Sequence, residues 1–439
     1  MRQPAAHATL FTFQQSNSED QATRILLSRS ISPAAGGSPA MAQIPPGPPG
    51  ARSLPALSEH LIEEILVRIP TPRDLVRASA ACATFRRLVA AASFLRRYRS
   101  LHPPPLLLGI LGPRGFLPAE APHPNALVAS VLARDADFST GHLPPRGRSG
   151  WLPCDARDGR VLLISSDPVA GSVLPELAAC DPLTRGFALL PPIPDSVVAS
   201  VLDPVRYKHV ENFEAFIIPS GDYDEEHFRV IAWTHCTAMA VVFVYSSLSG
   251  TWIAGTSANW DALGLNPSNS WPSYAYGCFY WKMLRSNKLL KLDANSMEFS
   301  AVGLPPNHEN RQVVVAEAGE GRIGILSCFL HQEIPESLCY SIMQNEGEDA
   351  NEHLMETTIP LPSDYDRYFV VGAAEGYIFL EGSRYIDQRG TGRPCARSSA
   401  FFSLEIKTLK IERVRSAPGG CVAILPYFGF PPFLSPRRI

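Results

Sequence analysis

Apolar residues recur at helical spacing in one short part of the chain, between residues 54 and 100. A stripe at i, i+1, i+4, i+5 and i+8 predicts an amphipathic helix that ends before Pro70, formed by Leu61, Ile62, Ile65, Leu66 and Ile69. Thr71-Pro72 is typical of a helix start and predicts a second helix, and a third runs from Phe85 to Leu95. Three short helices make a small core, which is usually stabilised by a neighbour or a partner.

From Pro103 onward the helical pattern gives way to β-branched and aromatic runs separated by glycine and proline, which predicts strands and turns. Glycine-led apolar strands begin at Gly159, Gly277, Gly321 and Gly376. Leu-Pro-Pro recurs at 143–145, 190–192 and 304–306, with a shorter Leu-Pro at 361–362, and the gaps are 47, 114 and 57 residues. A period of about 50 residues is that of propeller repeats.

Each repeat predicts a small antiparallel meander that cannot bury both of its faces alone, and radial stacking of such units buries them. About 330 residues at roughly 50–55 residues per unit predict six blades, with five or seven as alternatives. The fold class is therefore a small all-α segment followed by a mainly antiparallel all-β propeller. Two β-sandwich domains are the alternative for the second part, and a helical cap on the main domain is the alternative for the first.

Composition narrows the function classes. The 439 residues are 45% hydrophobic and 18% charged, so most of the chain is expected to fold, and 41 prolines disfavour long helices. A formal net charge of -3 gives no electrostatic case for nucleic acid or membrane as a partner. The nine cysteines form no CxxC pair and the histidines do not cluster, which predicts a reducing compartment and no metal site.

Residues 1–50 lack apolar periodicity and end in a run of prolines and glycines, so they are predicted to be a disordered leader. Three arginines and several serines suggest a transit peptide, but Glu19 and Asp20 argue against it. Met41 is an alternative start.

Residues 54–88 resemble the F-box, a short helical module of ubiquitin-ligase receptors. The matching segments are Leu54-Pro55, Glu64-Ile65-Leu66-Val67-Arg68-Ile69-Pro70, Asp74-Leu75-Val76-Arg77 and Cys82-Ala83-Thr84-Phe85-Arg86-Arg87-Leu88. Phe85 replaces the usual tryptophan, and Ala80-Ala81 replaces a bulkier pair. Both changes remove apolar area and are expected to weaken adaptor binding by ~1 kcal/mol each.

The region after the helices resembles the F-box-associated propeller domains of grasses, through the lines Cys154–Leu163 and Gly277–Trp281. After the leader at 1–50, the two resemblances imply an F-box at 51–101 and a propeller at 104–432. They also imply a location in the nucleus, the cytoplasm or both.

The F-box resemblance implies a Skp-type adaptor as partner and, through it, a cullin. The residues expected to bind the adaptor are Leu54, Pro55, Leu61, Ile65, Leu66, Ile69, Pro70, Leu75, Val76, Cys82, Phe85 and Leu88. The propeller is expected to bind a protein substrate. Trp260, Trp271 and Tyr274 lie among polar residues and are its candidate contacts, with a structural role as the alternative.

Candidate catalytic motifs are few. Gly319–Gly324 matches G-x-G-x-x-G, but a strand rather than a helix is predicted to follow it, so the glycines indicate a hairpin turn. The acidic residues 222–226 are expected in a solvated loop, and His235-Cys236 is expected to be a buried strand pair. We therefore expect a non-catalytic receptor without cofactor or metal. An F-box scaffold outside any ligase is the second hypothesis and a propeller enzyme the third.

Overall fold

The computed structural model describes residues 57–70, 72–102, 106–146, 150–166, 174–201, 212–218, 227–236, 238–266, 272–283, 285–329, 337–344, 353–386, 396–418 and 424–429. The predicted leader lies outside these ranges. The described part consists of a helical segment and a β-propeller.

The helical segment contains four helices, where the sequence predicts three: α1 (Glu59–Leu66), α2 (Pro72–Ala81), α3 (Ala83–Val89) and α4 (Ala92–Leu101). The expected third helix is divided because Ala91 is extended, with φ -68° and ψ 133°, and so begins a new helix. Ser58 caps α1, since its Oγ accepts a hydrogen bond from the Leu61 N–H at 3.3 Å. The helices share a core of their own, formed by Leu66, Val67, Leu75, Leu88, Val89, Phe94, Leu95 and Tyr98.

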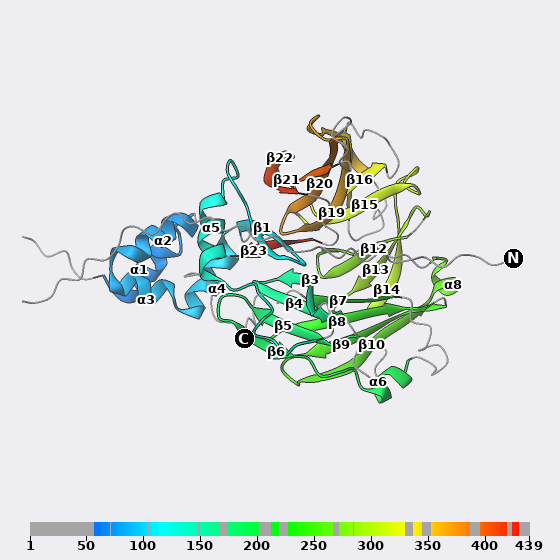
Figure 1. The fold of residues 1–439 in the computed structure, drawn as a ribbon, viewed down its shortest axis with the longest axis horizontal. Helices are drawn as coiled ribbons and strands as arrows, with labels where there is room; N and C mark the ends of the chain where they lie inside the picture. The colour runs from blue at the N-terminus through cyan, green and yellow to red at the C-terminus, as the bar shows by residue number, and fades with distance from the viewer. Residues whose placement is uncertain are drawn as a thin grey trace, which may run out of the picture. The chain divides into compact units, whose positions relative to one another are not determined.

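The β-region forms six antiparallel sheets, which we number as blades one to six (Figure 1). Blade one contains β1 (Leu106–Gly112), β2 (Gly115–Pro118) and β23 (Leu425–Gly429). Blade two contains β3 (Trp151–Arg157), β4 (Arg160–Ser165), β5 (Leu177–Asp181) and β6 (Gly186–Leu189). Blade three contains β7 (Asn212–Ile218), β8 (Arg229–His235), β9 (Met239–Ser246) and β10 (Thr251–Asn259).

Blade four contains β11 (Ser273–Ala275), β12 (Cys278–Lys282), β13 (Lys288–Asp293) and β14 (Glu298–Gly303). Blade five contains β15 (Arg311–Glu317), β16 (Arg322–Phe329), β17 (Ser337–Gln344) and β18 (His353–Pro360). Blade six contains β19 (Arg367–Ala374), β20 (Tyr377–Ile386), β21 (Ala396–Glu405) and β22 (Lys410–Pro418). The chain thus forms a six-bladed β-propeller, as the sequence predicts.

The last strand closes the ring. β23 pairs antiparallel with β1, so the end of the described chain completes the blade that its first strands begin, and Figure 1 shows β23 in red beside cyan β1. β23 also contacts β3 and β19, and β3 contacts β7, while β15 contacts β11 and β19. These strands are therefore the innermost of their blades and surround a central channel.

The inner hairpins explain the repeated glycines. In blades two, four, five and six the turn after the innermost strand has two consecutive residues with positive φ, and the second is always glycine: Asp158-Gly159, Tyr276-Gly277, Glu320-Gly321 and Glu375-Gly376. Such type I′ turns match the strand twist and favour glycine. The G-x-G-x-x-G motif is thus a hairpin between β15 and β16, as predicted.

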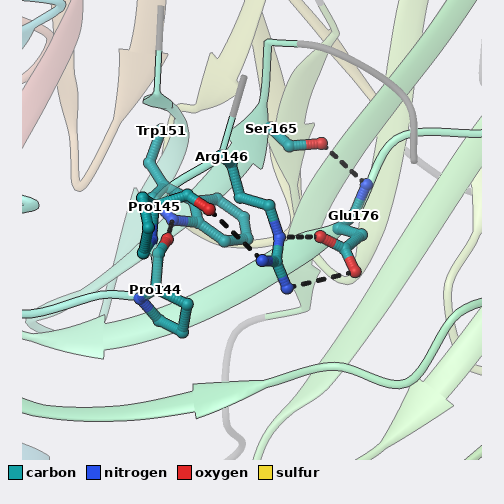
Figure 2. A network of polar contacts seen from close by, with 6 residues as sticks. All are labelled: Pro144, Pro145, Arg146, Trp151, Ser165 and Glu176. Atoms are coloured by element: carbon teal, nitrogen blue, oxygen red, sulfur yellow. Dashed lines mark hydrogen bonds and ion pairs between the residues drawn. The ribbon is translucent and has the colours of Figure 1, made fainter. Parts of the chain in front are cut away.

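The Leu-Pro-Pro segments precede the inner strand of a blade and are fixed by aromatic donors. Trp151 Nε1 donates to the Pro144 carbonyl at 2.9 Å, and Trp252 Nε1 donates to the Pro191 carbonyl at 2.6 Å. In Figure 2, Arg146 extends this contact by an ion pair with Glu176, whose N–H donates to Ser165 Oγ at 2.9 Å. The repeat therefore has a structural role.

Within the part of the β-region that the structure describes, three short helices occur where only strands are predicted: α5 (Ala126–Asp135), α6 (Asp195–Ala199) and α8 (Trp260–Leu263). α5 packs on β1 and β2 through buried Ala129 and Leu132, which lie at helical spacing. The sequence prediction missed it because only strands and turns were assigned after Pro103, although the apolar residues of this segment lie at helical spacing.

Candidate functional site

One face of α1 is apolar and exposed. Leu61 and Ile65 lie one turn apart with exposed fractions of 48% and 56%, and Leu57, just before the helix, is 53% exposed. Residues at i and i+4 lie on the same face of a helix, so Leu61 and Ile65 form an exposed apolar stripe, and Leu57 is exposed just before the helix begins. We call it the α1 stripe. It is separate from the core of the helical segment and is available to a partner.

The structure divides the residues predicted to bind the adaptor into two groups. Leu66, Leu75 and Leu88 are buried in the helical core, and Ile69 and Phe85 are partly buried against it. The exposed group consists of Leu61, Ile65, Pro70 and Cys82. Leu54 and Pro55 lie outside the described residues, and so does the side chain of Val76. Helical spacing alone does not separate the buried from the exposed residues, because the apolar residues of the sequence pattern extend over both the buried and the exposed face of the helix.

Charged pairs flank the α1 stripe and connect α1 to the following helices. Glu59 forms an ion pair with Arg87 of α3, and Glu64 forms one with Arg97 of α4 at 2.5 Å. The hydrogen bond from Arg97 lowers the pKa of the Glu64 carboxyl. Exposed pairs of this kind contribute little to stability, so burial of Leu66 and Val67 in the helical core, rather than these pairs, decides which side of α1 turns outward.

The aromatic residues predicted to bind a substrate do not form a rim cluster. Trp260 is only 3% exposed, because it begins α8 and its Nε1 donates to the Cys236 carbonyl at 3.0 Å. Its prediction as a surface contact is wrong. Trp271 lies outside the described residues, and Tyr274 is a partly buried residue of the inner strand β11.

A cavity of about 230 Å³ opens in the central channel. Its walls come from β3 and β19, together with Phe216 of β7, Pro272, Glu381 of β20 and the start of β23. Both β3 and β19 contain a register shift beside the cavity, at Pro153/Asp155 and at Val370/Gly372. Such bulges often turn side chains at a functional position.

Two charged residues of β3, Asp155 and Arg157, form polar contacts that hold one wall of the cavity in place. Asp155 is buried, and its Oδ2 accepts hydrogen bonds from the Ile217 N–H at 2.8 Å and from Arg157 Nε at 3.0 Å. The Arg157 guanidinium lies 4.9 Å from the centre of the Tyr274 ring, within cation–π range. Burial raises the pKa of Tyr274 to about 12. Tyr274 therefore packs behind Arg157 and is not itself among the residues that line the cavity.

Glu381 of β20 is one of the residues that line the cavity. It is 8% exposed, and its Oε1 has no hydrogen-bond partner. A buried carboxylate oxygen without a donor is costly, and native proteins usually supply one from the chain, from water or from a ligand.

The mouth of the channel is acidic. The type I′ turns place Asp158 and Glu375 there, and Glu317 ends β15 on the same side. The Glu375 side chain is exposed, but protein surrounds it from several sides. Lost hydration raises the pKa of Glu375 to about 7, and Asp158 and Glu317 add to this while Arg157 opposes it. The sequence prediction named neither Glu375 nor Glu381 as a site residue. An acidic residue followed by glycine recurs at the inner turns, and this pattern could have indicated Glu375.

The described residues contain no group of three or more His, Cys, Asp or Glu side chains that could hold a metal ion. None of the helices in that part of the chain is long and apolar enough to cross a membrane. Seven cysteines fall within the described ranges, and all seven are free thiols.

No known sequence family matches the chain, and no curated protein is similar to it. Solved structures that align with part of the chain include an exo-beta-1,3-galactanase from Clostridium thermocellum, with 11% identity, a TM-score of 0.32 and coverage of 63% of this chain and 64% of the galactanase. The WD40 domain of SCAP from fission yeast has 14% identity, a TM-score of 0.27 and coverage of 60% of this chain and 75% of that domain. The alignment spans less than two thirds of the galactanase, and no functional argument rests on likenesses of this size. A propeller is a fold that fits a protein-interaction domain, and its function has to be argued from its surfaces.

Proposed function

We propose that this chain is the substrate-recognition subunit of a cullin-based ubiquitin ligase. The helical segment binds a Skp-type adaptor as an F-box, and the propeller binds the protein to be ubiquitinated. The ligase chemistry belongs to the other subunits, so the chain itself is not catalytic. It acts in the nucleus, the cytoplasm or both.

The observation that carries the proposal is the α1 stripe. The helices already have a core, yet Leu61 and Ile65 remain exposed on one face of α1, and Leu57 is exposed just before it. Exposed apolar residues gathered on one face of a small helical unit favour a partner that buries them. These three positions lie within or beside the segment that resembles the F-box.

The test uses the purified full chain and a purified Skp-type adaptor, with complex formation measured by calorimetry and gel filtration. Replacing two exposed leucine-sized side chains by charge, as Leu61→Glu with Ile65→Glu, should abolish binding without unfolding the chain. Burying them in an interface is worth about 1.5–3 kcal/mol each, so their loss weakens binding at least a hundredfold.

Leu127→Glu is the matched control, because Leu127 is an exposed leucine of α5, 69% exposed, outside the helical segment. It should leave adaptor binding unchanged. Adaptor binding that survives the double change, or an adaptor that never binds the wild-type chain, would refute the proposal. Adaptor binding without recruitment of a cullin would instead favour a scaffold outside the ligase.

A further inference from the structure

We propose that the cavity in the central channel binds a cationic group on an apolar stem, an alkylammonium or a guanidinium, with Glu381 as its acceptor. The inference concerns the propeller only and does not depend on adaptor binding by the helical segment.

The first argument is the unused acceptor. Glu381 lines the cavity, is more than nine-tenths buried, and its Oε1 accepts no hydrogen bond. A cation in the cavity would supply the donor and neutralise the charge in one contact. Charge-assisted hydrogen bonds of this kind are roughly twice as strong as neutral ones.

The second argument is the charge balance along the channel. Arg157 is the cation of the wall, and it already pairs with Asp155 at 3.0 Å. Glu381 lies at one end of the cavity, opposite Phe369 in the β19–β20 pair, and Asp158, Glu317 and Glu375 lie at the mouth. Arg322 is a second cation near the mouth, where it pairs with Glu320 at 2.8 Å. The acidic groups named here still outnumber these two cations, and the field draws a positive group inward.

The third argument is the apolar lining between these ends. Side chains of β19 and of the closing strand line the space, chiefly Val370, Val371, Ala373, Ile424 and Leu425. An ion without a stem would leave this surface uncovered, whereas the methylenes of a lysine- or arginine-like group would cover it. At about 230 Å³ the cavity has room for one such group.

The test measures binding of defined probes to the purified full chain by calorimetry and ligand-observed NMR. The probes are putrescine, agmatine and the peptide acetyl-Gly-Lys-Gly-amide, and the same peptide acetylated on its side-chain amine is the neutral control. The cationic probes should bind and the acetylated peptide should not. Tighter binding of the peptide identifies the side chain of a protein as the source of the cation, and tighter binding of the diamines identifies a free amine.

Two variants locate the site. Glu381→Gln keeps the shape of the side chain and should weaken cation binding about tenfold, which corresponds to about 1.4 kcal/mol. Glu298→Gln, at an exposed position of β14, makes the same charge change outside the channel and should have no effect. Gly372→Leu should block all probes, because Gly372 lines the cavity and a Cβ there meets no atom within 4 Å.

The inference would be overturned if none of the cationic probes binds the folded wild-type chain. It would also be overturned if Glu381→Gln and Gly372→Leu both bind the probes as tightly as wild type does.

Discussion

Glu214 makes the propeller sensitive to pH through one buried carboxyl. It lies on the inner strand β7 at 9% exposure, where its Oε1 accepts from Asn212 Nδ2 at 2.8 Å and its Oε2 has no partner. Burial raises the pKa of Glu214 from 4.5 to about 7, although the hydrogen bond from Asn212 opposes this. The unfolded chain therefore loses this proton at lower pH than the folded one.

The sign and size follow from this difference. Below about pH 4.5 both states hold the proton, and Glu214 does not affect stability. Between about pH 4.5 and pH 7 Glu214 ionises only in the unfolded state, so the free energy of unfolding falls as the pH rises. Above about pH 7 Glu214 is ionised in both states, and the free energy of unfolding stays below its value at pH 4.5. Each pKa unit corresponds to about 1.4 kcal/mol, so the full loss is about 3 kcal/mol.

The assay compares wild type and Glu214→Gln by urea denaturation between pH 4 and pH 8.5. Fluorescence of Trp233 and Trp281, which stack at 4.4 Å between blades three and four, reports unfolding. The glutamine variant should match wild type at pH 4 and be about 3 kcal/mol more stable at pH 8. Taking the difference cancels other titrating groups, including His123 and His308, whose pKa values burial lowers. Parallel stability curves for the two proteins would refute the reasoning, and Glu298→Gln is the exposed control.

Three further predictions concern packing. Leu75→Ala, at 0% exposure, should destabilise the helical segment by about 2–5 kcal/mol and speed hydrogen exchange of its amides, whereas Ile65→Ala, at an exposed position, should leave exchange nearly unchanged. Gly109→Ala should lower the melting temperature, because Gly109 has φ +157° and a Cβ there would lie 2.3 Å from the Leu117 carbonyl oxygen; Gly372→Ala, with open space, should not. Tyr427→Ala should lower the free energy of unfolding by about 3 kcal/mol, because Tyr427 is 2% exposed and packs against Phe116 and Phe138. Urea denaturation measures this change, and an unchanged midpoint would show that closure by β23 contributes little.

The propeller could be predicted from the sequence because its repeat is local. The glycine of each inner turn and the Leu-Pro-Pro connections recur with the period of a blade, and both have the same structural role wherever they are described. The closure by β23 could not be predicted, since Leu425–Gly429 pairs with strands more than 300 residues earlier and carries no repeat signal of its own.

The candidate surfaces were harder to predict than the fold. Ile65 and Leu66 are adjacent and equally apolar, yet one is 56% exposed and the other 2%, because only the packing of the neighbouring helices decides which face is covered. The channel residues come from blades far apart in the sequence, so Glu381 and Asp155 line one cavity only after the ring closes. Trp260 was misplaced because its polar neighbours indicate a loop, whereas Asn259 caps a short helix there and turns the indole inward.

The most direct test of the receptor proposal is the composition of the complex that the full chain forms in cells. The tagged wild-type chain should co-precipitate a Skp-type adaptor and a cullin, and the variant with Leu61→Glu and Ile65→Glu should lose both while Leu127→Glu retains them. A wild-type chain that brings down neither protein, or a double variant that brings down both, would contradict the account.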